Sequence, residues 1–183
     1  KDSSSGYGLV TIALHWVCAL LIFFLFGLGV YMRGLDYYSP WYHKGPELHI
    51  ALGILIFTLM VLRLFWRLRG PQPEDIASIS KANLAAAKLV KFLLYLGVFV
   101  ICLSGYLITT AEGDAADFFG IFSIPATLKL TADQVDLGGK IHKYVAWSLV
   151  FIAVAHALAA LFHHFFKRDK TLVRMLKPAG KSE

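Results

Sequence analysis

Four long runs of apolar residues, separated by shorter polar segments, dominate the pattern of this sequence. They cover residues 9–31, 47–66, 89–111 and 141–166. Each run is long enough for an α-helix to cross the roughly 30 Å hydrocarbon layer of a bilayer, which takes about 20 residues. Because a helix satisfies its backbone hydrogen bonds within one segment, it is stable in lipid. The pattern predicts an all-α fold: a four-helix transmembrane bundle formed by one membrane domain, residues 1–183.

The polar segments predict short structures between and after the spans. Residues 1–8 predict a disordered or interfacial lead-in, and residues 167–183 a basic tail. Ser80 is expected to cap the third helix. In the longest connection, residues 112–140, the apolar run from Phe118 to Phe122 is too short to span a membrane and is expected at the interface. Thr131 and Gln134 have capping-box spacing, which predicts a short helix ended by Gly138 and Gly139.

Composition and charge support a membrane protein and give its orientation. The chain is 57% hydrophobic and 14% aromatic, with a mean hydropathy of +0.62. Residues 1–8, 63–91 and 167–183 hold one, six and six of the 18 Lys and Arg, so the positive-inside rule places both termini in the cytoplasm. The net charge of +6 is explained by this topology, and we expect no nucleic-acid partner. The first run contains His15 and lacks a small-x-small cleavage site, so we expect a true span instead of a signal peptide.

Histidines inside the apolar runs are the candidate chemistry. His142 and His156 lie on one helical face, within about 40° of each other and about 21 Å apart along the axis. The topology puts His49 and His142 in the outer half and His15 and His156 in the inner half. Ionisable residues inside a membrane span are costly and are functional candidates by default. The alternative is that these histidines are buried structural residues. Two histidines on one helical face make that interpretation less favourable.

Two histidines at each depth match bis-imidazole ligation of haem iron. Zinc prefers four tetrahedral ligands, and no carboxylate or thiol lies near either pair in the sequence. Cys18 and Cys102 both lie in apolar runs and are expected to pack in the core. Since the chain lacks a Cys-x-x-Cys-His motif, haem would be held without covalent attachment.

The sequence resembles the bacterial cytochrome b561 proteins, a family of four-span, di-haem, quinone-linked cytochromes of the bacterial inner membrane. The resemblance covers nearly the whole chain. It rests on Leu14-His15-Trp16, Leu48-His49 with Gly53, Arg63 with Trp66-Arg67-Leu68, Ser104-Gly105-Tyr106, His142, His156 with His163-His164, and the run from Asp169 to Met175. One departure is Lys91, which stands where many relatives have a histidine, so no ligand is expected there.

The resemblance implies two haem b groups with His15, His49, His142 and His156 as iron ligands. From spacing alone, His163 competes with His156 for the inner site, because it lies about 20° away on the same face. The resemblance favours His156. The residues expected to contact haem or quinone are Gly53, Arg63, Arg67, Gly105, His163 and Arg168.

In function, the resemblance implies an oxidoreductase that takes electrons from superoxide at the outer face and reduces ubiquinone on the inner side. Lys44, Lys140 and Lys143 lie near the outer histidines in sequence and would attract an anion. The outer side as a whole carries five basic and seven acidic residues, which would repel superoxide at long range. One alternative is a membrane anchor that passes electrons between quinone and a separate periplasmic redox protein. Another is a structural or transport bundle without a cofactor.

Overall fold

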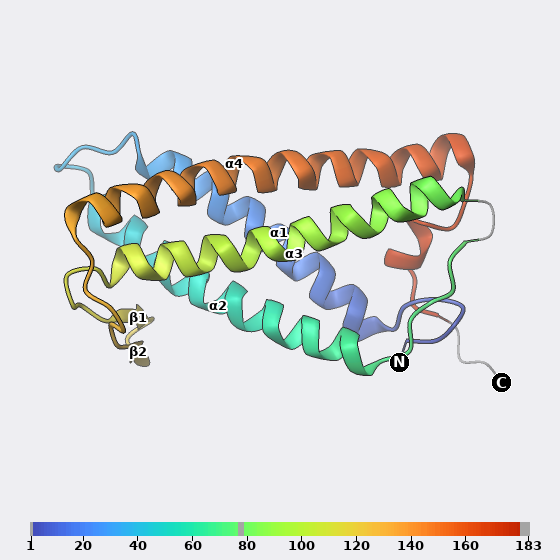
Figure 1. Ribbon diagram of the computed structural model, residues 1–183, viewed down its shortest axis with the longest axis horizontal. Coiled ribbons are helices and arrows are strands. Elements are labelled where there is room, and N and C mark those ends of the chain that lie inside the picture. Colours follow the sequence, from blue (N-terminus) through green and yellow to red (C-terminus); the bar gives the residue numbers. More distant parts are fainter. Residues whose placement is uncertain (1, 77–78, 180–183) are drawn as a thin grey trace.

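Four long helices run side by side in the computed structural model, which describes residues 2–76 and 79–179 (Figure 1). They are α1 (Leu9–Met32), α2 (Trp41–Arg69), α3 (Lys81–Thr109) and α4 (Ala132–Phe162). Each is long and apolar enough to cross a membrane. The predicted all-α, four-helix transmembrane bundle is therefore confirmed. Both termini lie at one end of the bundle, which we call the inner end in keeping with the positive-inside rule; the opposite end is the outer end.

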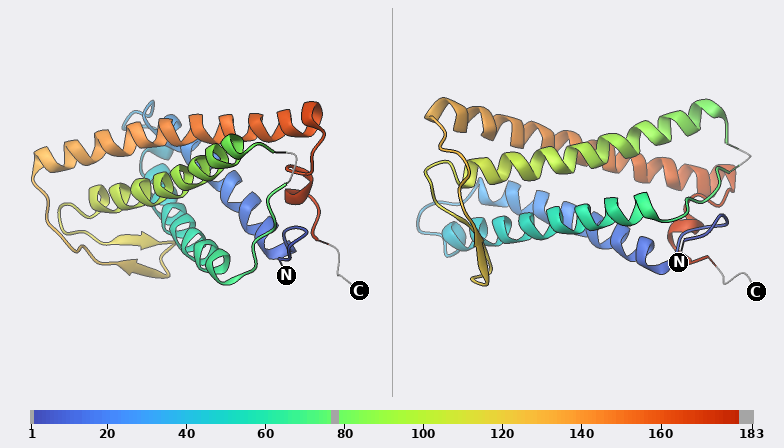
Figure 2. Two further views of the ribbon diagram at one scale, coloured as in Figure 1. Left: turned by 45° about the vertical axis from the view of Figure 1, so that its right-hand side comes forward. Right: turned by 60° about the horizontal axis from the view of Figure 1, so that its bottom comes forward.

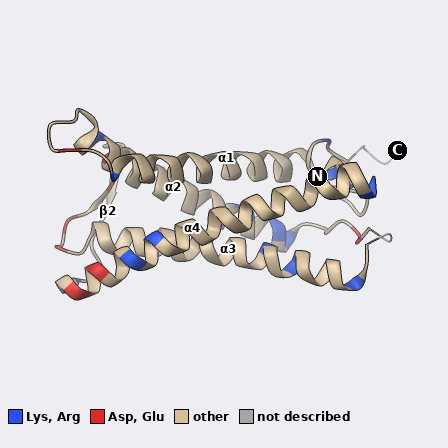
Figure 3. Ribbon diagram, turned by 90° about the horizontal axis from the view of Figure 1, so that it is seen from above, with Lys and Arg blue, Asp and Glu red and all other residues tan. Residues whose placement is uncertain are grey.

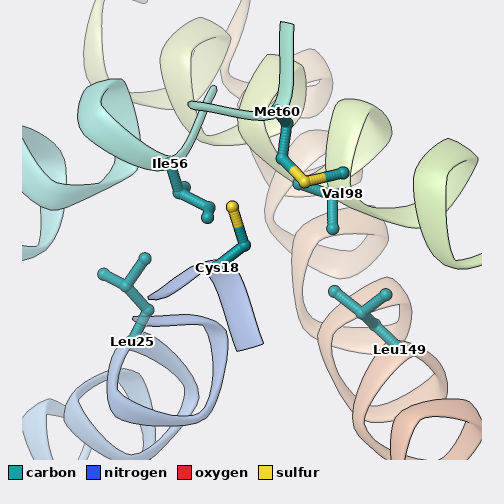
Figure 4. Packing of buried hydrophobic residues seen from close by; sticks show 6 residues of the cluster. All are labelled: Cys18, Leu25, Ile56, Met60, Val98 and Leu149. Carbon is teal, nitrogen blue, oxygen red and sulfur yellow. The ribbon is translucent and has the colours of Figure 1, made fainter. Parts of the chain in front are cut away.

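Helix pairing leaves α4 separated from the first two helices. α1 packs mainly on α2, and α3 packs on α2 and on α4, whereas α4 makes few direct contacts with α1 (Figure 2). At mid-height, apolar side chains from all four helices meet in one cluster (Figure 4): Cys18, Leu25, Ile56, Met60, Val98 and Leu149. Leu149 lies midway along α4 between His142 and His156. The cluster thus forms an apolar layer between the outer and inner histidines.

Local capping residues begin two of the helices as predicted. The Ser80 hydroxyl accepts a hydrogen bond from the Asn83 backbone N–H at 3.3 Å. At the start of α4, the Thr131 N–H donates to Oε1 of Gln134 at 2.9 Å, which completes the capping box. Both caps satisfy backbone groups that a helix end leaves without intrahelical partners.

Three helices begin well before the predicted spans: α2 at Trp41, α3 at Lys81 and α4 at Ala132. The early part of α2 includes Pro46, and Gly45 permits its close approach to the end of α1, since a Cβ there would lie 3.0 Å from Cγ of Met32. The prediction that Gly138 and Gly139 end a short helix is wrong, since α4 continues through them. A Cβ at position 138 would lie 3.3 Å from Cγ1 of Ile108, so this glycine permits close packing of α3 on α4.

A small hairpin covers the outer end beside α2 (Figure 2). Its strands β1 (Ala116–Phe118) and β2 (Phe122–Ile124) pair antiparallel, and the Phe118 and Phe122 rings stack with centroids 4.8 Å apart. The turn uses Phe119 and Gly120 at positive φ. The apolar run from Phe118 to Phe122 therefore does not span the membrane, as predicted, although the sequence did not indicate strands.

The terminal segments fold onto the inner end of the bundle. After the π-helix η1 (His163–Lys167), the chain turns back and forms the short 3₁₀ helix η2 (Val173–Met175). Nε1 of Trp16 donates to the Met175 carbonyl at 2.7 Å. The Asp2 carboxylate accepts hydrogen bonds from the Gly8 N–H and the Thr11 hydroxyl. The described part of residues 1–8 is thus an ordered turn, which contradicts the disordered alternative of that prediction, while the interfacial alternative stays a prediction. Residues 180–183 of the predicted tail lie outside the described residues.

Charged residues lie mainly toward the two ends of the bundle. Figure 3 shows Lys and Arg at the inner end, and acidic residues with a smaller number of basic ones at the outer end. The first turn of α4 carries Asp133, and Asp136 follows in the next turn. The long apolar middle of the bundle is consistent with a hydrocarbon environment.

Candidate functional site

The structure brings His49 and His142 together in the outer half of the bundle. His49 extends from the third turn of α2 and His142 from α4, across the interface where these helices have few direct contacts. Their ring centroids are 6.1 Å apart and the rings are inclined by 62°. The two imidazoles face each other, as the sequence predicted from their matched depth.

A glycine lies next to each of the two imidazole rings. A Cβ at Gly29 would lie 3.4 Å from Cε1 of His49, and a Cβ at Gly105 would lie 3.1 Å from Cε1 of His142. Even an alanine at position 105 would crowd the His142 ring, whereas a Cβ at position 29 would make an ordinary van der Waals contact with His49. Gly105 was a predicted site residue, and Gly29 was not among the predicted site residues.

These outer residues fit an iron porphyrin. A metal–imidazole bond is about 2 Å long, and the ring centre lies about 1 Å further, so two imidazoles on opposite sides of one iron have centroids about 6 Å apart. Nδ1 of His49 is buried without a hydrogen-bond partner in the described structure. Half-buried Gly53 has no atom within 4 Å of a Cβ placed on it, which leaves space one turn from His49. The described residues contain no cluster of three or more His, Cys, Asp or Glu, so the zinc alternative has no support in this part of the chain.

A second histidine pair lies in the inner half. His15 on α1 and His156 on α4 are near enough to interact electrostatically. Nη2 of Arg63 lies 2.9 Å from Nδ1 of His15. Because a guanidinium can only donate, Nδ1 accepts this bond and the ring proton lies on Nε2. His156 is the histidine of α4 that interacts with His15, whereas His163 lies in η1 and contacts Asp169.

Cations surround this inner pair. Arg63 and Arg67, one helical turn apart, are both half-buried on α2, and Lys91 of α3 approaches Arg67 and His156. Arg63 also lies over the Tyr95 ring, 5.5 Å from its centroid. Within the described residues no carboxylate lies at salt-bridge distance from these three cations. Buried charges in membrane spans need a counter-charge, so the arrangement is suited to an anionic group.

His163 has a different partner, at the inner end. Its Nδ1 is 2.5 Å from Oδ2 of Asp169, and the Asp169 side chain is only 6% exposed. Arg168 adopts φ 52°, and its N–H bonds to the His163 carbonyl, which brings Asp169 back to the ring. Burial by itself raises the pKa of the Asp169 carboxyl, but hydrogen bonds from Thr171 and His163 outweigh it and hold the pKa below its usual value. The sequence indicated Asp169 only as part of a motif, since its pairing depends on the turn that follows η1.

The remaining predicted residues lie at the surface. Lys44, Lys140 and Lys143 are all exposed at the outer end, and Lys143 lies over the Tyr144 ring. Arg168 is exposed and lines a hollow at the inner end with Lys170 and Arg174, where Glu74 and Asp75 also contribute. None of the three lysines has a recorded contact with His49 or His142 in the described structure, so their role stays a prediction.

Comparisons with known proteins agree with this architecture. A model of the family described as prokaryotic cytochrome b561 matches residues 6–178. "Cytochrome b561 homolog 2" of Escherichia coli (strain K12) is 44% identical over 181 residues, which is 99% of this chain and 95% of that protein. "Probable superoxide oxidase CybB" of Yersinia pestis is 29% identical over 93% of this chain and 95% of its own length. "Cytochrome b562" of Cereibacter sphaeroides is 28% identical over 94% of this chain and 96% of its own length.

Proposed function

Because this chain belongs to the prokaryotic cytochrome b561 family, whose members transfer electrons in membranes with b-type haem, we propose that it holds two haems and reduces ubiquinone with electrons from an outer-side donor. The observation that carries the proposal is the His49–His142 pair, with ring centroids 6.1 Å apart. This spacing would let both imidazoles hold one haem iron. His49 and His142 would hold the outer haem, and His15 with His156 the inner one.

Arg63 supports the inner site. Loading Nε2 of His15 with iron requires that nitrogen to lose its proton, so the 2.9 Å hydrogen bond from Arg63 to Nδ1 would have to break. The guanidinium would then be free to pair with a haem propionate, as would Arg67 and Lys91. Three cations without a carboxylate partner in the described structure would in this way gain counter-charges inside the membrane.

The apolar layer around Leu149 would separate the two cofactor sites. Bound haem supplies a one-electron Fe(III)/Fe(II) couple. The buried side chains of this layer exclude water and keep the local dielectric low, which favours electron transfer without proton leakage (Figure 4). The protein thereby provides two redox positions, one toward each membrane face.

His163 and Asp169 supply a proton-donating group for quinone at the inner end. The Asp169 carboxylate on Nδ1 orients the imidazole, and when the ring carries both protons its Nε2–H can donate to a quinone carbonyl. Reduction of ubiquinone to ubiquinol takes two electrons and two protons. Arg168 and Lys167 would assist at the same rim by attracting the developing negative charge.

Superoxide is the donor we propose, because a relative similar to this chain over nearly its whole length is named for that activity. Each superoxide anion loses one electron to become dioxygen, so two are consumed for each ubiquinol formed. The exposed Lys44, Lys140 and Lys143 would attract the anion locally against the net negative charge of the outer side.

Stopped-flow mixing of superoxide with the oxidised, haem-loaded protein and ubiquinone tests this proposal. We expect haem reduction followed by ubiquinol in a ratio of one per two superoxide anions, and no reaction after superoxide dismutase is added. Lys140→Gln should slow haem reduction at low salt, whereas Lys129→Gln, an exposed lysine elsewhere on the outer side, serves as the control. Haem that stays oxidised would eliminate superoxide as the donor.

A further inference from the structure

The Ser104 hydroxyl lies between a backbone carbonyl and one of the outer histidines. Ser104 is buried on α3, and its Oγ donates a hydrogen bond to the Ile101 carbonyl at 3.0 Å. The same oxygen is 3.1 Å from Nδ1 of His142 on α4. This contact joins residues 38 positions apart in the sequence.

The direction of the first hydrogen bond determines that of the second. A serine hydroxyl has one proton, which Ser104 gives to the Ile101 carbonyl, a group that can only accept. Its oxygen therefore offers a lone pair to His142, and Nδ1 of His142 must carry the proton. In a neutral imidazole with a proton on Nδ1, Nε2 has a free lone pair, which is the form that ligates a metal.

The two outer histidines differ in this respect. Nδ1 of His49 is buried and has no hydrogen-bond partner in the described structure. A glycine lies beside each ring, but the Ser104 hydroxyl, together with the Ile101 carbonyl that also approaches His142, distinguishes the His142 side from the His49 side. An acceptor on the distal nitrogen raises the basicity of a ligating imidazole.

We infer that Ser104 is a positioning residue that fixes the tautomer and orientation of His142 and tunes the outer haem. This inference rests on the proposed function, since it assumes that His142 ligates iron. A more basic ligand stabilises Fe(III) over Fe(II), so the Ser104 hydrogen bond lowers the reduction potential of the outer haem relative to a ligand without it. The outer haem would bind the incoming electron less tightly and pass it inward more readily.

The matched pair Ser104→Val and Ser104→Thr tests the hydroxyl at constant side-chain shape. Redox titration of the purified protein should show a higher reduction potential for the outer haem in Ser104→Val than in the wild type. We expect the equilibrium constant for its reduction to rise about tenfold, which corresponds to about 59 mV for one electron. Ser104→Thr should restore the wild-type value. Thr58→Val is the control, because the Thr58 hydroxyl bonds to the Ile54 carbonyl at 2.9 Å on an exposed face of α2. A merely structural hydroxyl would lower thermal stability in Ser104→Val without moving the potential.

A second measurement determines which ring nitrogen of His142 carries the proton. In protein purified from haem-deficient cells and labelled with ¹⁵N-histidine, proton–nitrogen correlation spectra should assign the His142 proton to Nδ1, because iron on Nε2 would by itself leave the proton on Nδ1. The assignment needs no haem, so it separates the two claims: a protein without haem from haem-replete cells would overturn the proposed function, whatever the tautomer. With haem present, equal outer-haem potentials in Ser104→Val and Ser104→Thr would overturn the role of Ser104. That result would follow if the Ile101 carbonyl accepted the His142 N–H hydrogen bond in place of the hydroxyl. A His142 proton on Nε2 would also overturn it.

Discussion

Arg63 donates a 2.9 Å hydrogen bond to His15 inside the apolar part of the bundle. A charged guanidinium at this depth is costly unless a counter-charge is near, and within the described residues none lies at salt-bridge distance. We predict that Arg63→Met lowers the potential of the inner haem by tens of millivolts, because loss of a nearby positive charge favours Fe(III). Arg63→Lys should retain most of the wild-type potential. Redox titration resolves the two haems, and a shift confined to the outer haem would contradict the placement of Arg63 beside the inner one.

The histidine that ligates the inner haem can be identified by replacing His156 and His163 one at a time. His156 faces His15, whereas His163 is bonded to Asp169. His156→Ala should lose the inner haem and keep the outer one. His163→Ala should keep both haems and slow quinone reduction by about tenfold or more, since proton transfer by a positioned side chain contributes at least this much. Haem content and ubiquinol formation measure both effects; loss of a haem in His163→Ala alone would reverse the assignment.

Asp169 should make the inner end sensitive to acid. Its carboxyl pKa is lower in the folded protein than in the unfolded chain, so the stabilisation is fully present above the unfolded value of about 3.9. It is lost as the pH falls through the folded pKa. We predict that the difference in unfolding temperature between the wild type and Asp169→Asn is present at pH 5 and shrinks progressively as the pH falls below about 4. A difference that does not shrink at all between pH 5 and pH 2 would show that Asp169 acts without its charge.

Gly105 should be sensitive to even a methyl group. A Cβ there would lie 3.1 Å from Cε1 of His142, so Gly105→Ala must displace the ring by a few tenths of an ångström. We expect reduced occupancy or an altered spectrum of the outer haem only. Gly27→Ala is the matched control, because nothing lies within 4 Å of its added Cβ and alanine favours the helix by about 1 kcal/mol. Equal spectra for both variants would mean that the His142 ring has room to move.

The sequence predicted the parts of the structure that depend on lipid, and missed those that depend on how helices meet. Long apolar runs identify membrane-spanning helices because a helix makes all its backbone hydrogen bonds within one segment, whereas an unpaired strand or loop in lipid cannot. Gly138 was misread because a glycine that ends a helix and one that permits close packing, here on Ile108, look alike in one sequence. The contact between Ser104 and His142 depends on the rotation of α3 against α4, which periodicity does not define. His49 and His142 could be paired by depth, because helical rise converts sequence position into distance along the membrane normal.

Haem quantitation on the purified wild type and on His49→Ala tests the central claim most directly. Extraction into acidified organic solvent should yield two b-type haems per wild-type polypeptide, since the chain has no motif for covalent attachment. His49→Ala should yield one, with the inner haem spectrum unchanged, because His142 alone supplies a single axial ligand. A ratio near one in the wild type, or loss of both haems from folded His49→Ala, would contradict two independent bis-histidine sites.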